Sequence, residues 1–281
     1  MSFPTVYLND EYLPLSEAKI SVLDRGFLFG DGVYEVIPAY NRRLFHLPEH
    51  LQRLANSLDN IHLAVPYDQR QWQEILTPLL DDTPDQYIYL QITRGAAEKR
   101  DHAFPRNVSP TVFAMAAPIK PYPDLQRGVR AITMEDSRWR LCHVKAITLL
   151  GNILLRQQAV EQDCAEAILI RQDHITEGAA SNVFAVLDGT LTTPPNSNDI
   201  LPGITRDVIL QLARDNQLPA AEKPISLRQL QSASEIWLSS STREILPVVE
   251  LDGAAVGAGR PGPVWQTLQG LFREYKQSVS S

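Results

Sequence analysis

Residues 166–194 read EAILIRQDHITEGAASNVFAVLDGTLTTP, and this stretch decides the class of fold. Apolar runs of strand length follow one another here, separated by turn residues, and Asp188-Gly189 is a strong signal for a β-hairpin. No helical spacing of apolar residues lies between these strands. The stretch therefore indicates neighbouring strands rather than the strict strand–helix alternation of a doubly wound parallel sheet.

The rest of the chain carries the same mixture of elements in both halves. Strands are predicted at 6–8, 12–15, 32–40, 44–47, 87–95, 111–119, 129–134 and 235–241, with a hairpin at 248–256. Helices are predicted at 47–58, 70–80, 153–162, 204–216 and 263–276. Because strands outnumber helices in both halves, the predicted fold class is α+β.

The segment Lys120-Pro121-Tyr122-Pro123-Asp124 is the best candidate for a linker. Its two prolines hold the chain extended and suppress both helix formation and strand pairing. A chain of 281 residues also has the length at which one domain tends to become two. We therefore predict an N-terminal domain at 1–119, a linker at 120–124 and a C-terminal domain at 125–281.

Composition and charge narrow the class of protein. The net charge is −7 and the pI is about 5.4, with no basic block, so neither a nucleic acid nor an acidic membrane is an expected partner. Residues 1–10 show no signal-peptide pattern, and no run approaches the ~20 apolar residues that span a bilayer. Cys142 and Cys164 are the only cysteines and lack metal-ligand spacing. We expect no metal site and a reducing compartment, the cytoplasm.

Lys145 lies in the segment HVKAITLLGN (143–152) and is the only formally charged residue between Arg140 and Arg156. Its methylenes could cover apolar surface while the ammonium reaches water. Alternatively, a partly desolvated lysine loses its proton easily and becomes a nucleophile for a carbonyl group. The segment alone leaves both interpretations open.

Three features suit an anion such as phosphate. Gly203-Ile204-Thr205 opens a predicted helix, whose first N–H groups and dipole attract negative charge. Four hydroxyl residues, 239–242, end a predicted strand, and Arg53 could pair with phosphate through two hydrogen bonds. Each feature also has an ordinary structural interpretation, as a helix N-cap, a polar turn or a surface charge.

Two further features suit a cofactor ring and a substrate. Glu177 lies at a turn between strands and, if buried, needs a cationic or proton-donating partner. Arg100 and His102 lie in the polar loop RGAAEKRDHAFP (94–105), where a guanidinium fork and a second donor can bind an anion. A solvated turn and a solvated loop are the structural alternatives.

Gly30-Asp31-Gly32 resembles a phosphate loop only superficially. It lacks the third glycine of a dinucleotide fingerprint, and a strand follows it instead of a helix. We interpret these glycines as a tight turn before the strand that carries Tyr34.

Taken together, these candidates supply one lysine nucleophile, one carboxylate, phosphate-binding groups and a carboxylate-binding pair. Those are the requirements of a pyridoxal phosphate (PLP) enzyme, which needs a Schiff-base lysine, an acidic partner for the pyridine nitrogen and a phosphate anchor.

The chain resembles the fold-type IV (class IV) PLP aminotransferases, and within them most closely the D-amino acid aminotransferases. The resemblance runs nearly end to end and is carried by six motifs. They are RGFLFGDGVYEV at 25–36, QITRG at 91–95, HVK at 143–145, TEGAASNVF at 176–184, LPGITRDV at 201–208 and SSSTREILPV at 239–248.

The resemblance implies a role for each matching residue. Lys145 is expected to be the Schiff-base lysine and proton shuttle, and Glu177 the partner of the pyridine nitrogen. For the phosphate, the resemblance implies Ile204 and Thr205 as a cup, Ser240 or Ser241 on its other side and Arg53 as a charged clamp. Ser181 and Asn182 are further implied cofactor ligands. Tyr34, Arg100 and His102 are the implied substrate ligands, the last two for the α-carboxylate.

It also implies a two-domain fold, with a small N-terminal α/β domain and a larger, β-rich C-terminal domain with helices. The cofactor is expected between the domains, and a homodimer is expected to complete the active site. The implied reaction is a ping-pong amino transfer between a D-amino acid and a 2-oxo acid.

Two departures from the pattern leave alternatives open. The 94–105 loop is one residue longer, so that Lys99 could replace Arg100 as the anion ligand, and Pro38 stands where close relatives often have a basic residue. Alternative activities of the same fold are an aminodeoxychorismate lyase, an (R)-selective amine transaminase and a branched-chain aminotransferase. A branched-chain enzyme typically has Phe-Glu-Gly-x-Arg where this chain has residues 34–38. A phosphate-ligand binding protein without chemistry is the alternative from another class.

Overall fold

The computed structural model describes residues 4–122 and 125–280, which form two compact units. Unit 1 comprises 4–120 with Val144–Leu149 and Ser280, and unit 2 comprises Pro121–His143 and Leu150–Val279. The chain thus passes from unit 1 to unit 2 inside the predicted linker, of which Pro123 and Asp124 lie outside the described residues. The predicted domain boundaries did not include one feature: the segment Val144–Leu149, which carries Lys145, belongs to unit 1.

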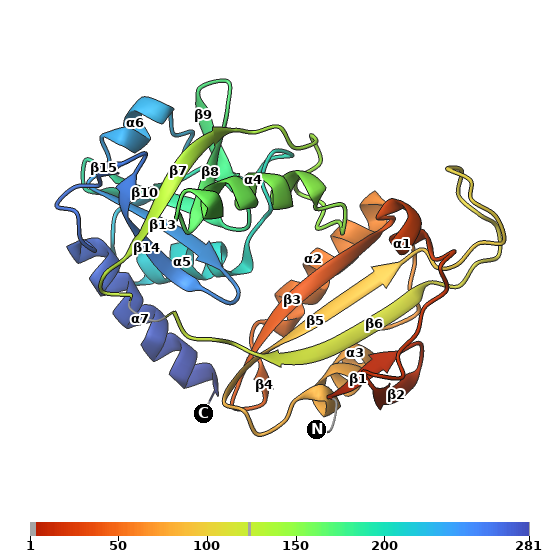
Figure 1. The fold of residues 1–281 in the computed structure, drawn as a ribbon. Coiled ribbons are helices and arrows are strands. Elements are labelled where there is room, and N and C mark those ends of the chain that lie inside the picture. Colours follow the sequence, from red (N-terminus) through yellow and green to blue (C-terminus); the bar gives the residue numbers. More distant parts are fainter. Residues whose placement is uncertain (1–3, 123–124, 281) are drawn as a thin grey trace. The chain divides into compact units, whose positions relative to one another are not determined.

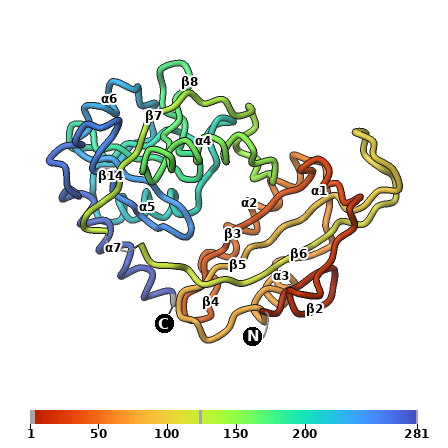
Figure 2. The backbone as a smooth tube through the Cα atoms, in the orientation of Figure 1, coloured from red at the N-terminus to blue at the C-terminus, as the bar shows by residue number. Residues whose placement is uncertain are grey.

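Unit 1 is built on an antiparallel sheet with, among the described residues, six strands in the order β2-β1-β6-β5-β3-β4. These are β1 Thr5–Leu8, β2 Glu11–Pro14, β3 Gly32–Tyr40, β4 Arg43–Leu44, β5 Asp85–Thr93 and β6 Thr111–Pro118. The N-terminal β1, red in Figures 1 and 2, lies beside the yellow β6 although about a hundred residues separate them. The long central pair β3–β5 positions Tyr34 within the sheet.

The helices of unit 1 are α1 Arg25–Phe29, α2 Leu47–Asn60, α3 Gln69–Leu76 and the 3₁₀ turn η1 Thr77–Leu79. Pro48 fits the first turn of α2, where its missing N–H is not needed. The leucines that recur at helical spacing in α2 are all buried, and they pack with the apolar face of β3 and β5. An Asp68–Gln71 capping box begins α3.

Unit 2 contains a mixed sheet that runs β12-β11-β10-β13-β14-β7-β8-β9 in the described part of the chain, with β15 paired to β14. The strands are β7 Val129–Glu135, β8 Glu166–Arg171, β9 His174–Gly178, β10 Asn182–Leu187, β11 Thr190–Thr193, β12 Ala220–Glu222, β13 Glu235–Ser240, β14 Glu244–Leu251 and β15 Ala254–Ala255. β7 pairs in parallel with both β14 and β8, and β10 lies antiparallel between β11 and β13.

The helices of unit 2 are α4 Leu150–Glu161, α5 Ile204–Asp215, α6 Leu227–Gln231 and α7 Pro263–Ser280. Trp237 of β13 and Trp265 and Phe272 of α7 are almost completely buried. Large aromatic side chains of this kind contribute much of the apolar area that holds a helix on a sheet.

The predicted α+β fold is confirmed, and every predicted strand and helix is present within a few residues. At the hairpin, Asp188 and Gly189 have φ of 48° and 76°, as a type I′ turn requires. The prediction missed α1, β12 and α6. Each has only three to five residues, too few to display a period of apolar residues.

The sequence analysis expected neither a membrane-spanning segment nor a metal site. Within 4–122 and 125–280, no helix combines the length and the apolar character needed to cross a membrane. The same residues contain no cluster of three or more His, Cys, Asp or Glu side chains that could hold a metal ion.

A buried charge cluster joins β3 to α2 in unit 1. Glu35 is fully buried and accepts hydrogen bonds from Nε and Nη2 of Arg53, both at 2.8 Å, and His50 Nδ1 lies 2.8 Å from its Oε2. Burial by itself would raise the pKa of Glu35, but Arg53 and His50 lower it well below its ordinary value. The carboxylate is therefore ionised, and the guanidinium depends on it for compensation.

We predict that Glu35→Ala lowers the free energy of unfolding by about 3–5 kcal/mol, because it removes the buried carboxylate that accepts two hydrogen bonds from Arg53. Denaturant unfolding measures the loss. The control is Glu49→Ala, which removes a more exposed carboxylate from the helix that carries Arg53, and for which a change below ~0.5 kcal/mol is expected. Equal effects of the two substitutions would contradict the cluster's structural role.

Candidate active site

The backbone of Lys145 is fastened to unit 1. Its carbonyl accepts the N–H of Tyr34 at 3.0 Å, and its own N–H donates to Ser57 Oγ at 3.1 Å. Two residues further on, the N–H of Ile147 donates to the carbonyl of Gly32 at 3.1 Å. The segment therefore runs along the start of β3 as a short additional strand would.

The side chain of Lys145 is half-buried, and its Nζ lies 4.2 Å from the centroid of the Tyr34 ring. At this distance the negative face of the ring attracts an ammonium group. The structure thus brings together two of the residues that the sequence singled out, one as nucleophile and one as substrate ligand. The ring of Tyr89 lies 5.8 Å from that of Tyr34 and continues the aromatic surface.

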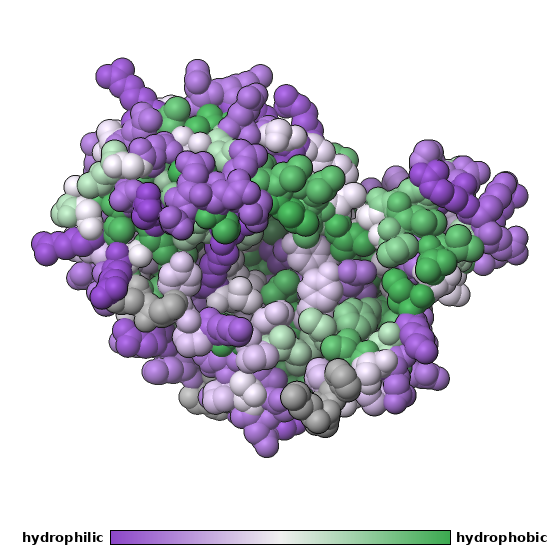
Figure 3. Space-filling model, in the orientation of Figure 1, coloured by the Kyte–Doolittle hydropathy of each residue, from purple (hydrophilic) through white to green (hydrophobic). Residues whose placement is uncertain are grey.

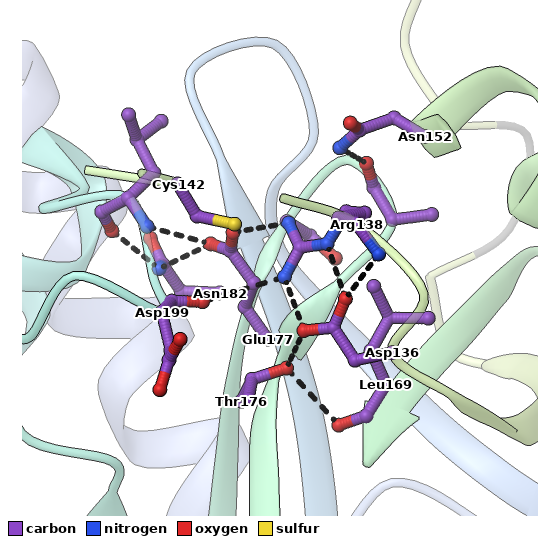
Figure 4. Close-up of polar contacts among 12 residues, drawn as sticks. Asp136, Arg138, Cys142, Asn152, Leu169, Thr176, Glu177, Asn182 and Asp199 are labelled. Carbon is purple, nitrogen blue, oxygen red and sulfur yellow. Dashed lines mark hydrogen bonds and ion pairs between the residues drawn. The ribbon is translucent and has the colours of Figure 1, made fainter. Parts of the chain in front are cut away.

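In unit 2, Glu177 at the end of β9 is buried among hydrogen-bond donors (Figure 4). Arg138 Nη1 donates to its Oε1 at 2.6 Å, and the N–H of Leu201 donates to its Oε2 at 3.0 Å. Burial raises the pKa of Glu177 to about 7, against the opposite influence of Arg138 and the Leu201 N–H. The carboxyl group therefore changes protonation state near neutral pH.

Arg138 does not hold Glu177 ionised, because it shares its charge with a second carboxylate. Its Nε and Nη2 each donate to Asp136 at 2.9 Å, and Thr176 Oγ1 donates to Asp136 at 2.8 Å (Figure 4). Burial favours the neutral form of Asp136, but the hydrogen bonds from Arg138 and Thr176 outweigh it and lower its pKa. Asp136 therefore accepts two hydrogen bonds from the guanidinium, and Glu177 accepts one.

Sequence reasoning did not find Asp136 or Arg138. The available signal was two opposite charges at positions 136 and 138, directly after the strand VRAITME. Residues two apart in extended chain point to the same side, so both charges could have been assigned to one face. The sequence held no indication that this face was buried.

The first turn of α5 lies against the same part of unit 2. Asn182 Nδ2 donates to the carbonyl of Leu201 at 2.9 Å, and a Cβ atom at Gly203 would come within 1.9 Å of Asn182 Oδ1. Only glycine fits at this N-cap, which offers no side chain to the N–H groups of Ile204 and Thr205. The positive end of the helix dipole is therefore suited to an external anion.

The hydroxyl residues lie beside it. Ser239 of β13 pairs in register with Asn182 of β10, which places Ser240 and the following turn next to the start of β10. Ser240 Oγ accepts the N–H of Arg243 at 3.3 Å. Ser181 Oγ donates to the buried Glu166 at 3.1 Å, so this hydroxyl already has an internal acceptor.

The remaining predicted ligands belong to unit 1. Arg53 points from α2 to Glu35, as described above, and its contact with a phosphate stays a prediction. Arg100 and His102 lie in the exposed loop after β5, and both approach the ring of Phe29. The guanidinium carbon of Arg100 is 4.9 Å from that ring centroid, and the His102 ring is 5.3 Å from it. The two residues of the predicted carboxylate-binding pair therefore both lie next to the ring of Phe29.

Each unit supplies part of what PLP requires. Unit 1 holds an amine over an aromatic ring, and unit 2 holds a buried carboxyl group of raised pKa and a glycine-capped helix start with hydroxyls beside it. These groups fit an aldehyde, a pyridine nitrogen and a phosphate, respectively.

The family model of amino-transferase class IV matches residues 32–251, which is most of the chain. This chain is a class IV aminotransferase. The match contains Lys145, Glu177 and the α5 start, and enzymes of this family use PLP.

Curated relatives extend the likeness to nearly the whole chain. A D-alanine aminotransferase of Staphylococcus haemolyticus is 42% identical over 280 residues, covering 98% of this chain and 99% of the relative. One from Bacillus licheniformis is 40% identical over 267 residues, covering 94% of each protein.

Solved structures share the fold. The branched-chain amino acid aminotransferase of Escherichia coli superposes with a TM-score of 0.91 at 29% identity, covering 98% of this chain and 94% of that one. The branched-chain enzyme of the archaeon Thermoproteus uzoniensis, solved with norvaline, has a TM-score of 0.86 at 29% identity, covering 100% and 95%. The predicted fold type, enzyme class and cofactor are confirmed, whereas the individual ligand roles stay predictions.

Glu177 should make stability depend on pH in a defined window. Its pKa in the folded chain, about 7, lies above the ordinary 4.5, so the native state binds this proton more tightly than the unfolded state. Its contribution is complete below pH 4.5 and is lost as the pH rises through 7. We predict that Glu177→Gln removes this decline in the free energy of unfolding of the cofactor-free protein.

Denaturant unfolding at pH 5, 6 and 7 measures the difference from the parent protein. The exposed substitution Glu161→Gln on α4 serves as the control and should leave the slope unchanged. A parent-like slope in Glu177→Gln would show that the buried carboxyl group has an ordinary pKa.

Proposed function

We propose that this enzyme transfers the amino group between a D-amino acid and a 2-oxo acid by a ping-pong mechanism. The observation that carries the proposal is the identity of about 42% over 98% of the chain to enzymes named D-alanine aminotransferase. The geometry of each unit supports it, because the reacting groups of such an enzyme are present and locally ordered.

Lys145 is the proposed catalytic residue. When bound, PLP supplies an aldehyde carbon for an amine and a ring that withdraws electrons from the substrate Cα. Nζ of Lys145 would hold the cofactor at this aldehyde. As a free amine within reach of the substrate Cα, Nζ would remove the Cα proton as a general base and return it as a general acid. Tyr34 lies under the ammonium and fixes where that proton is held.

Glu177 is proposed to hold the proton of the pyridine nitrogen. A buried carboxyl group whose pKa is about 7 can share a proton with a weakly basic nitrogen near neutral pH. Its Oε1 and Oε2 are fixed by Arg138 and the Leu201 N–H, so the group is oriented before the cofactor arrives. Preorganised charge of this kind stabilises the developing carbanion without rearrangement.

The phosphate is proposed to bind at the start of α5, with the N–H groups of Ile204 and Thr205, the hydroxyls of Ser240 or Ser241, and Arg53 as a clamp. Gly203 supports this proposal, since it closes the N-cap by fitting against Asn182 instead of by a capping side chain.

Arg100 and His102 are proposed to bind the substrate α-carboxylate. Arg100 and His102 both contact the ring of Phe29, which favours Arg100 over Lys99 as the carboxylate ligand. Lys99 is exposed, and the extra residue in the loop keeps it as the alternative ligand. A carboxylate ligand pair also favours amino acids over simple amines as substrates.

With the amine and carboxylate of the substrate held, only one enantiomer presents its Cα–H to Lys145. We therefore predict that D-alanine converts the cofactor absorption spectrum at least about a hundred-fold faster than L-alanine, the matched control. Rapid mixing of the enzyme with D- and L-amino acids and simple amines measures this half-reaction.

Other results of that assay identify the other activities. Preference for L-leucine or L-valine would favour a branched-chain enzyme, the activity named for the structural neighbours. Faster reaction of chiral amines would favour an amine transaminase. Repeated turnover of an aminodeoxychorismate-like substrate to pyruvate, without an amino acceptor, would favour a lyase.

A homodimer is proposed from one exposed face of α4. Leu150, Ile153 and Leu154 are 69%, 59% and 55% exposed, and Figure 3 shows apolar side chains gathered over this helix. A contiguous apolar face of this kind usually marks a protein interface. We also propose a cytoplasmic location, because Cys142 and Cys164 are free thiols in the described chain.

We predict that Ile153→Asp dissociates this dimer by placing a charge in the apolar face. Light scattering coupled to size-exclusion chromatography measures the mass. Gln158→Asp, on the same helix at an exposed polar position, is the control. A dimer that tolerates Ile153→Asp, or a monomeric parent protein, would exclude this face as the contact.

A further inference from the structure

The short helix α1 contacts the loop that carries Arg100 and His102, yet none of the roles proposed above involves α1. The Arg25 guanidinium is 4% exposed and donates to three successive carbonyls of that loop. Nη1 lies 2.5 Å from the Asp101 oxygen and 3.3 Å from that of Ala103, and Nη2 lies 3.2 Å from that of His102. One side chain therefore fixes the backbone around the two proposed carboxylate ligands.

Arg25 is itself anchored in the body of unit 1. Its Nε donates to Asp31 Oδ2 at 2.7 Å, and Asp31 also accepts two hydrogen bonds from Arg94, at 2.8 and 3.0 Å. Arg94 Nη2 in turn donates at 2.7 Å to the carbonyl of Ile61, next to the end of α2. The loop backbone is thus tied to the sheet and helices through a chain of charge-assisted hydrogen bonds.

Phe29, one helical turn after Arg25, contacts the functional ends of the same loop. Its ring centroid lies 4.9 Å from the guanidinium carbon of Arg100 and 5.3 Å from the His102 ring centroid, and it lies 4.9 Å from the guanidinium carbon of Arg25. The ring face attracts the two guanidinium groups, and the His102 ring packs against it at a tilt of 54°. Arg100 and His102 are otherwise exposed residues of an exposed loop.

Long exposed side chains lose rotamer freedom when they bind a ligand, and prior ordering removes that loss from the binding step. We propose that α1 is the platform that preorganises the substrate-carboxylate site, with Arg25 fixing the loop backbone and Phe29 fixing the heads of Arg100 and His102. Both are positioning residues that act through the carboxylate ligands. The inference rests on the proposed function of Arg100 and His102.

The ring of Phe29 is the feature to test, because it can be removed without unpairing a buried charge. In the holoenzyme, Phe29→Leu should raise the KM for D-alanine and for its 2-oxo acid acceptor roughly five-fold while kcat stays unchanged. The inhibition constant of acetate, a carboxylate without an amine, should rise by a similar factor. Phe29→Tyr keeps the ring and should retain the parent constants.

Phe27→Leu is the matched control. Phe27 lies on the same helix and is 68% exposed, so this change should leave all three constants unchanged. Arg25→Lys keeps the charge without the planar fork and should raise the same constants as Phe29→Leu. Cofactor absorbance is recorded for each variant and should stay at the parent level, since the platform holds substrate and not cofactor.

Arg100→Ala separates the failure of this inference from failure of the proposed function. If it raises both KM values and Phe29→Leu does not, the platform is overturned and the carboxylate role stands. If Arg100→Ala and His102→Ala leave both KM values and the acetate constant unchanged, the carboxylate role fails and the inference with it. In a protein lacking both ligands, Phe29→Leu should add nothing, and an additional effect there would mean that the ring acts elsewhere.

Discussion

The proposed chemistry depends first on how the backbone of Lys145 is held. Two hydrogen bonds, from the Tyr34 N–H and to Ser57 Oγ, fasten this residue to unit 1 although the chain has already passed into unit 2. Here the chain returns to unit 1 for the six residues Val144–Leu149 before it continues in unit 2. From this fixed backbone, the side chain places Nζ 4.2 Å from the centroid of the Tyr34 ring. A nucleophile placed in this way reacts without first being ordered.

The second constraint is the unequal sharing of one guanidinium by two carboxylates. Burial raises the pKa of Glu177, and the one hydrogen bond from Arg138 does not offset it. The two hydrogen bonds from Arg138 to Asp136 help to outweigh burial there and lower the pKa of Asp136. The pKa values of these two buried carboxyl groups are therefore shifted in opposite directions, because their surroundings differ. Hydrogen bonds from Arg138 and the Leu201 N–H fix the orientation of Glu177. Its pKa of about 7 suits a carboxyl group that shares a proton with a pyridine nitrogen.

The sequence predicted the long elements because their apolar periods extend over many residues, as in the leucines of α2 and the strands around Asp188-Gly189. It also provided the candidate site residues, since their motifs are local, and their roles stay predictions. It did not predict α1, which has five residues, or the partners Arg138, Arg25 and Phe29. Their roles arise from contacts between segments far apart in the chain, such as Arg25 with residues 101–103. Neither the periodicity of apolar residues nor the spacing of the motifs indicates such contacts.

The most direct measurement is to reduce the holoenzyme with borohydride and map the modified peptide by mass spectrometry. The account predicts one phosphopyridoxyl group per chain, attached to Lys145, and its loss when a D-amino acid and no acceptor are added before reduction. A label on another lysine, or an unlabelled chain in a protein that retains the cofactor, would contradict it.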